Sequence, residues 1–162
     1  MRLEGSCHCG AIQFSAESVH PYPYMWCYCS ICRKTAGGGG YGVNIQADYA
    51  TLVIEGREHL RDFHATIRDP GKKDRKSVGE RFFCGECGTQ LWVWDRRWPE
   101  MFHPHASAID TLLPEPPSRT HIMLAFKAPW VQPDIRPGDK TFDRYPDESI
   151  AAWHERMGLV VQ

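Results

Sequence analysis

Short runs in which apolar and polar residues alternate make up most of this chain. Alternation of this kind is typical of β-strands with one buried face. β-Branched and aromatic residues are frequent in the same runs, which also favours strands, and Gly, Pro, Asp and Asn between the runs favour turns. The pattern predicts strands at residues 11–15, 41–45, 51–54, 60–67, 78–83, 91–94 and 121–126.

One segment near the end has helical periodicity instead. Ile150, Trp153 and Met157 would lie on one face of a helix. Asp147 is expected to cap its first turn and Gly158 to end it. We therefore predict a single, mainly β domain over residues 1–162, with a small C-terminal helix over residues 147–158.

Several loop segments differ in composition from the predicted strands. Residues 37–40 are four consecutive glycines, which form either a flexible loop or a backbone that a ligand can approach closely. Residues 69–76 are charged and are expected at a hairpin tip or in a mobile loop. Pro-rich stretches at 114–117 and 129–137 are expected to be extended surface connections within the domain.

Composition and charge exclude several classes of protein. The 162 residues are 42% hydrophobic and 24% charged, a mixture that excludes wholesale disorder. The net charge of -1 argues against a general nucleic-acid-binding protein. No apolar run reaches the length of about 18 residues that a membrane span needs, and the first residues lack the apolar region of a secretory signal. We therefore expect a cytoplasmic protein with reduced thiols and no membrane or nucleic-acid partner.

The seven cysteines fall into three compact groups. Close spacings let two or three thiolates reach one metal ion, and a following glycine, as at Gly10 and Gly88, suits a backbone that turns back on itself. An odd number of cysteines in a reducing compartment indicates metal ligands or nucleophiles. The groups are Cys7-His8-Cys9, Cys27-Tyr28-Cys29-Ser30-Ile31-Cys32 and Cys84-Gly85-Glu86-Cys87.

These groups divide into a set of four and a set of three. Four thiolates complete a structural zinc site, whereas three leave one tetrahedral position open, as in a catalytic zinc site. The opposite division, in which the central group joins one outer pair, would leave two thiols over. The set of four, called the outer set below, is Cys7, Cys9, Cys84 and Cys87. The set of three, called the triple, is Cys27, Cys29 and Cys32.

Three other interpretations of the cysteines carry less weight. Free cysteines are often small buried hydrophobic residues, but seven in three tight groups favour metal binding. A redox pair at Cys84 and Cys87 would need a βαβ context, whereas the flanking sequence is strand-like on both sides. A disulfide framework is disfavoured by the odd count and by the absence of a signal sequence.

The cysteine groups and their neighbours resemble the glutathione-dependent formaldehyde-activating enzyme family. The resemblance runs from about residue 5 to residue 146. It implies an Mss4-like zinc-binding β fold of short antiparallel sheets, a structural zinc on the outer set and a catalytic zinc on the triple. The matching segments are Gly5-Ser6-Cys7-His8-Cys9-Gly10-Ala11-Ile12, Cys27-Tyr28-Cys29-Ser30-Ile31-Cys32-Arg33-Lys34, Phe83-Cys84-Gly85-Glu86-Cys87-Gly88-Thr89-Gln90-Leu91, His121-Ile122 and Lys127-Ala128-Pro129-Trp130.

The family's activity implies a carbon–sulfur lyase. Its reaction joins formaldehyde and glutathione to S-hydroxymethylglutathione, so a glutathione-like thiol and a small aldehyde are the expected substrates. A zinc ion with an open position can hold a substrate thiol as thiolate. Three protein thiolates on Zn²⁺ already carry a charge of about -1, so an anionic tripeptide needs cationic contacts. Arg33 and Lys34, directly after Cys32, are expected to supply them, with a solvated charged face as the alternative.

The sequence gives weaker indications of a metal-binding or acid–base role for the histidines and acidic residues outside the cysteine groups. His103 and His105 are expected to be surface or core residues, because the cysteines satisfy the metal count. Pro104 between them makes a regular strand there doubtful. His8 is expected to pack near the outer set, and no spacing brings His64, Asp110 or Glu115 to the triple as an acid or base.

Two further functions compete with the enzyme. In a zinc-stabilised binding module both metals would only hold the fold, and a protein side chain would close the fourth position of the triple. A methionine sulfoxide reductase on the same fold would need a cysteine nucleophile outside the metal sites, and the division into four and three leaves none.

Overall fold

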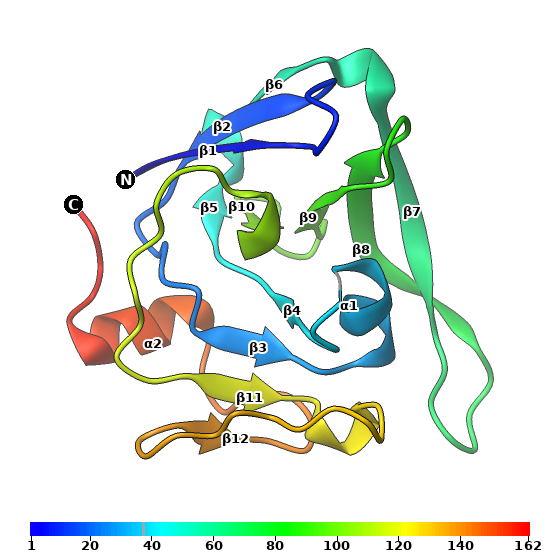
Figure 1. The fold of residues 1–162 in the computed structure, drawn as a ribbon, viewed down its shortest axis with the longest axis vertical. Coiled ribbons are helices and arrows are strands. Elements are labelled where there is room, and N and C mark those ends of the chain that lie inside the picture. The colour runs from blue at the N-terminus through cyan, green and yellow to red at the C-terminus, as the bar shows by residue number, and fades with distance from the viewer. Residues whose placement is uncertain (37) are drawn as a thin grey trace.

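Three small β-sheets and two helices form the computed structural model, which describes residues 1–36 and 38–162 (Figure 1). The mainly β architecture with a small C-terminal helix is confirmed. Gly37 lies outside the described residues, so the expectation for the glycine run can be followed only at residues 38–40. None of the described helices is long and apolar enough to span a bilayer.

The first sheet is antiparallel and has the order β1-β2-β6. Leu3 and Phe14 are buried on its inner face, as alternation along the strands requires. Gly5 faces Phe14 across β1 and β2, where a Cβ atom would lie 2.5 Å from the Phe14 ring. The strands are β1 (Arg2–Ser6), β2 (Gln13–Glu17) and β6 (Val53–Glu55).

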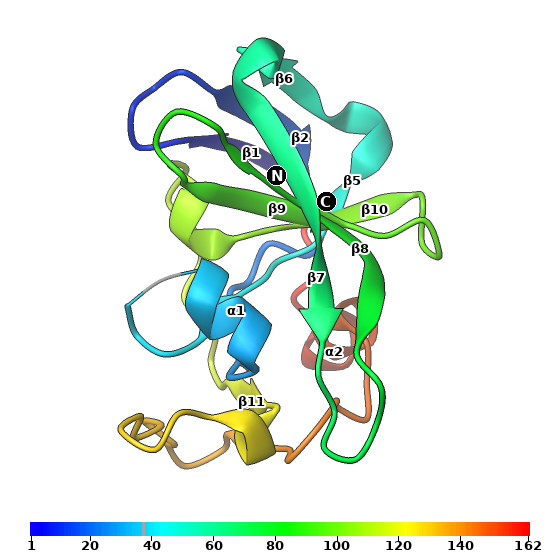
Figure 2. The ribbon, with the colours of Figure 1, turned by 90° about the vertical axis from the view of Figure 1, so that its right-hand side faces the viewer.

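The second sheet, also antiparallel, has the order β5-β10-β9-β8-β7. Its two longest strands form a hairpin that extends past the other strands alongside the first helix (Figure 2). Residues 68–74 connect them, so the charged segment does lie at a hairpin tip. The strands are β5 (Ala47–Asp48), β7 (Leu60–Ile67), β8 (Arg75–Cys84), β9 (Gln90–Trp94) and β10 (Met101–Pro104).

The third sheet is mixed and has the order β12-β11-β3-β4. β11 pairs in parallel with both β3 and β12, whereas β3 and β4 are antiparallel. The strand expected at 121–126 ends at Ile122 and continues as a 3₁₀ turn, and only Gly42–Val43 of the strand expected at 41–45 forms a ladder. The strands are β3 (Met25–Cys27), β4 (Gly42–Val43), β11 (Thr120–Ile122) and β12 (Lys140–Thr141).

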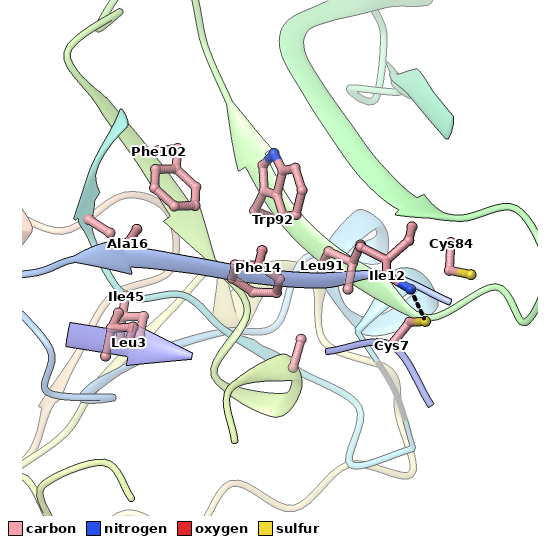
Figure 3. Close-up of a cluster of buried hydrophobic side chains, with 12 residues drawn as sticks. Leu3, Cys7, Ile12, Phe14, Ala16, Ile45, Cys84, Leu91, Trp92 and Phe102 are labelled. Carbon is pink, nitrogen blue, oxygen red and sulfur yellow. Dashed lines mark hydrogen bonds between the residues drawn. The ribbon is translucent and has the colours of Figure 1, made fainter. Parts of the chain in front are cut away.

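The main core lies between the first two sheets. Phe14 packs edge-on against Trp92, with ring centroids 5.1 Å apart. Figure 3 shows Cys7 and Cys84 at one end of this cluster, with the Ile12 N–H donating to the Cys7 sulfur. The outer set therefore lies at the edge of the core. The central residues of the core are Leu3, Ile12, Phe14, Ile45, Leu91, Trp92 and Phe102.

The helices differ in part from the expectations. The C-terminal helix α2 spans Ile150–Met157 and ends at Gly158, as predicted. The predicted cap, Asp147, is wrong: Ser149 caps the helix by accepting from the Ala152 N–H at 3.1 Å, and Asp147 is 3.7 Å from Lys140. The six-residue helix α1 (Ser30–Thr35) was not predicted. The 3₁₀ turns of the described residues are η1 (Tyr49–Thr51), η2 (Arg57–His59), η3 (Ala106–Ala108) and η4 (Leu124–Phe126).

Candidate metal centres and the adjoining groove

The outer set is assembled from two similar turns. In the first, the Gly10 N–H donates to the Cys7 carbonyl at 3.0 Å; in the second, the Gly88 N–H donates to the Cys84 carbonyl at 2.9 Å. Both glycines have a φ of 76°, a left-handed conformation that favours glycine. The first turn follows β1 and the second follows β8, so two sheets each contribute a pair of thiols.

The geometry of the outer set fits one tetrahedral metal ion. The Sγ atoms of Cys7 and Cys9 are 3.5 Å apart, and those of Cys9 and Cys84 are 3.8 Å apart. A tetrahedron with metal–sulfur bonds of about 2.3 Å has sulfurs about 3.8 Å apart. The Ile12 N–H donates to the Cys7 sulfur at 3.2 Å, and such contacts orient and stabilise thiolate ligands. This set can therefore hold a metal ion.

The triple lies at the junction of β3 and α1. Cys27 ends β3, Cys29 is the N-cap of α1, and Cys32 lies within that helix. Their three sulfurs lie within 4.8 Å of one another. Gly42, opposite Cys27 on β4, allows the helix to pack closely, because a Cβ atom there would be 3.1 Å from the Cys32 Cβ.

Short-range contacts favour a thiolate at Cys29. The thiols of Cys27 and Cys32 lower its pKa to about 2, together with the N–H groups of Cys32 and Ile31 and against the effect of burial. The Cys32 N–H is 3.3 Å from the Cys29 sulfur. Cys27 and Cys32 are buried, whereas Cys29 is partly exposed. The triple thus has one side toward solvent and a donor set that soft metal ions prefer.

Together the two sets contain all seven cysteines, as the spacing predicted. In the described part of the chain, no His, Asp or Glu ligand atom joins the triple as a fourth member. The chemistry of the donors fits zinc in both places, since thiolate sets of four and three are typical structural and open sites.

Arg81 on β8 reaches the triple, a contact that the sequence did not indicate. Its Nη2 atom is 3.7 Å from the Cys32 sulfur. The contact with Cys27 lowers the pKa of the Cys32 thiol, but Cys29 and burial outweigh it, so this pKa is raised, and the positive charge of Arg81 opposes the rise. Its Nη1 atom is buried and has no partner among the described residues. A guanidinium here offsets part of the negative charge that three thiolates bring together.

A groove of about 400 Å³ runs between α1 and the β7–β8 hairpin. Arg33 and Lys34 line it, as do Arg68 and Lys76 from the hairpin. No carboxylate is among its described lining residues. Arg68 is paired with Asp74 at 3.2 Å, but neither Arg33 nor Lys34 has an ion-pair partner in the described ranges. The full lining is Ser30, Ile31, Arg33, Lys34, Thr35, Phe63, His64, Ala65, Thr66, Arg68 and Lys76.

The two histidines considered as further metal ligands lie on β10 and directly after it. His103 lies on β10, which does include Pro104 as its last residue, and His103 hydrogen-bonds with the Ile45 carbonyl at 3.2 Å. His105 is fully buried, and this burial, with the charges of Arg81 and His103, lowers its pKa to about 3. Neither histidine belongs to the cysteine sets found among the described residues.

Two of the three acid–base candidates lie away from the groove. His64 does line it. Asp110 instead hydrogen-bonds with Ser6 at 2.7 Å, on the side of the first sheet, and Glu115 is not among the groove residues. His8 is exposed, and its N–H donates to the Thr89 hydroxyl, which connects the two turns of the outer set.

Fold and site together define a small β protein with two cysteine clusters that could each hold a metal ion, one of them beside a cationic groove. Residues 2–124 match the family described as glutathione-dependent formaldehyde-activating enzyme, and the chain belongs to that family. A protein of Halomonas elongata named "Putative glutathione-dependent formaldehyde-activating enzyme" is 56% identical over 159 residues, which cover 98% of each chain. A crystal structure of a Rhodobacter sphaeroides protein shares the fold, with a TM-score of 0.50 and 19% identity over 88% of this chain and 99% of that one.

Proposed function

We propose that this protein is a zinc-dependent carbon–sulfur lyase-type enzyme that joins a glutathione-like thiol to a small aldehyde, with formaldehyde as the reference substrate. The observation that carries the proposal is a three-thiol set without a fourth protein ligand among the described residues, beside a groove with unpaired cationic side chains. The family match and the named Halomonas relative support the substrate class.

In this proposal the two cysteine sets have different roles. The outer set holds a structural zinc that connects the turns after β1 and β8. The triple would hold the catalytic zinc, which when bound would stabilise a substrate thiol as its thiolate near neutral pH. Arg81 offsets the charge of the thiolates through its contact with Cys32.

The groove residues bind and orient the thiol substrate. Glutathione carries two carboxylates, and Arg33 and Lys34 lie where α1 meets the groove. Guanidinium–carboxylate contacts are strong and directional, so they fix the position of the sulfur relative to the triple. Phe63 provides an apolar wall for the peptide backbone. Such positioning converts an encounter between two molecules into a reaction within one complex.

The chemical step is an addition that balances without a redox partner. The substrate sulfur attacks the aldehyde carbon and forms the C–S bond, while the carbonyl π electrons move to oxygen. The oxygen then takes up the proton that the thiol lost, which gives the hydroxymethyl thioether. The reverse sequence is the lyase reaction.

Native mass spectrometry with and without reduced glutathione tests this proposal. We expect two zinc ions per chain and one bound glutathione, and acceleration of the glutathione–formaldehyde condensation followed by NMR. Cys29→Ser is expected to lose one zinc and the rate, and Lys72→Gln, at the hairpin tip outside the groove, is the matched control. Two zinc ions with neither glutathione binding nor rate acceleration would instead support a zinc-stabilised binding module. A triple that stays empty in excess zinc would overturn the mechanism.

A further inference from the structure

A buried chain of hydrogen bonds connects Asp139 to Tyr28, the residue between two cysteines of the triple. Asp139 Oδ2 is 3.1 Å from His121 Nε2, and His121 Nδ1 is 2.9 Å from the Tyr28 hydroxyl. The side chains of His121 and Asp139 are 0% and 2% exposed, and Tyr28 is fully buried. The three residues come from distant parts of the sequence and have no role in the proposed chemistry.

The direction of these hydrogen bonds follows from Asp139. Its Oδ1 accepts from the Arg119 N–H at 2.7 Å and its Oδ2 from the Arg136 N–H at 2.9 Å. Burial opposes ionisation, but these N–H groups and His121 outweigh it and lower the pKa of Asp139. An ionised carboxylate only accepts, so His121 Nε2 donates to it. When the imidazole is neutral, His121 Nδ1 then accepts, and the Tyr28 hydroxyl donates to it.

Tyr28 is held at both ends. Its backbone N–H donates to the Ile122 carbonyl at 3.0 Å, and its hydroxyl is fixed by His121. Its ring packs in a cluster with Ala128 and Val131. Tyr28, between Cys27 and Cys29, is therefore anchored through both its backbone and its side chain.

We propose that Asp139, His121 and Tyr28 are positioning residues that hold the Cys27–Cys29 segment in the geometry a metal ion needs. Rotation of the Tyr28 peptide would move both sulfurs at once, and the chain of hydrogen bonds prevents that rotation. The inference rests on the part of the proposed function in which the triple binds a metal ion, but not on the reaction.

Zinc affinity of the triple, measured by chelator competition, tests the inference. Tyr28→Phe keeps the ring and removes only the hydroxyl, and we expect it to weaken zinc at the triple by about 10- to 100-fold. Zinc at the outer set should be unchanged, which gives an internal reference. Tyr41→Phe is the matched control, because the Tyr41 ring lies beside Tyr28 but outside the hydrogen-bonded chain. Cobalt-loaded Tyr28→Phe protein should show altered ligand-field bands, which a purely structural role would not change.

Asp139→Asn provides a second variant. If the residues act as one unit, Asp139→Asn and the double variant with Tyr28→Phe should each lose about as much zinc affinity as Tyr28→Phe alone. Unchanged affinity and cobalt bands in Tyr28→Phe, with only a lower melting temperature, would overturn the inference. Wild-type protein that binds zinc at the triple but has no condensation activity would refute the proposed reaction and leave this inference standing. A wild-type triple that binds neither zinc nor cobalt would refute both.

Discussion

Arg81 Nη2 lies 3.7 Å from the sulfur of Cys32 and brings a cation from the second sheet to the helix of the triple. This contact connects two segments 49 positions apart. Hydrogen bonds that involve a charged partner contribute about 1.5–3 kcal/mol, so removal of the guanidinium should raise the free energy of three adjacent thiolates by a comparable amount.

Arg81→Met should therefore weaken zinc binding at the triple by about tenfold or more at pH 7, because protons compete better for the thiols. Arg81→Lys keeps the charge and should recover part of the loss. Chelator competition at several pH values measures both. Equal affinities for wild-type protein and Arg81→Met would show that the contact has no electrostatic role.

Neutralisation of Arg33 or Lys34 should weaken binding of the anionic substrate. S-Methylglutathione is a suitable probe, because it keeps both carboxylates but cannot form a thiolate. We expect Arg33→Gln and Lys34→Gln to raise its Kd by about five- to tenfold at low salt and by less at high salt. Calorimetry measures the effect, with Lys72→Gln as the control. No change in Kd in either variant would place the carboxylates elsewhere.

The two cysteine sets should contribute unequally to stability. A metal on the outer set crosslinks positions such as Cys9 and Cys84, 75 positions apart, whereas the triple closes only a short segment. Constraint of the unfolded chain grows with the length of the closed loop. Cys87→Ser, at an exposed position, should thus lower the free energy of unfolding by more than about 2 kcal/mol, and Cys29→Ser by less. Denaturant unfolding in excess zinc checks the order, and the reverse order would contradict the assigned roles.

The environment of His154 should make the folded protein less stable in weak acid. Its buried ring donates from Nδ1 to the Ile150 carbonyl at 2.8 Å and accepts at Nε2 from the Tyr22 N–H at 3.2 Å, so the neutral form is needed. Burial, together with nearby His20, lowers its pKa to about 4. The unfolded chain, with an ordinary histidine pKa near 6.5, takes up the proton first. The stabilisation of the folded state by neutral His154 is thus complete above about pH 6.5 and is lost as the pH falls toward 4.

Between pH 7 and pH 5 this one group should cost about 2 kcal/mol of stability. Wild-type protein and His154→Leu share all other titrating groups, so the difference between their pH slopes isolates the effect. Denaturant unfolding at both pH values measures it. Parallel slopes would mean that His154 does not control the acid sensitivity.

Two glycines with similar backbone angles should respond differently to alanine. Gly56 has a φ of 73° and Gly71 a φ of 76°. A Cβ atom at Gly56 would lie 1.8 Å from the Ala11 carbonyl oxygen, whereas nothing lies within 4 Å at Gly71. Gly71→Ala should cost only the left-handed strain of about 1–2 kcal/mol, and Gly56→Ala clearly more. Thermal unfolding compares them, and equal losses would show that the backbone near Ala11 yields freely.

The cysteine groups could be predicted from the sequence, because thiols that share one metal ion must lie close together and this restricts the spacing of the cysteines along the chain. The helix α1 could not, since six residues give no periodicity and its cap is Cys29, an uncommon capping residue. Arg81 gave no signal, because its contact with Cys32 depends on how β8 lies beside α1. The sequence predicts Asp147 as the helix cap, whereas Ser149 caps the helix, because both residue types suit that role and only the local backbone decides between them.

The positions of the two cysteine sets along the chain determine which set can form first while the protein is being synthesised. Every thiol of the outer set has been made once residue 87 emerges, and the first two sheets need only Gln90–Trp94 of β9 and Met101–Pro104 of β10 beyond it. The triple is made earlier, but His121 and Asp139, which anchor it, follow much later in the chain. Because domains begin to form from the N-terminal side on the ribosome, the outer set can assemble while the triple is still loosely held. With the roles proposed above, a nascent chain would acquire the structural metal of the outer set before the triple reaches the geometry needed to bind a substrate thiol.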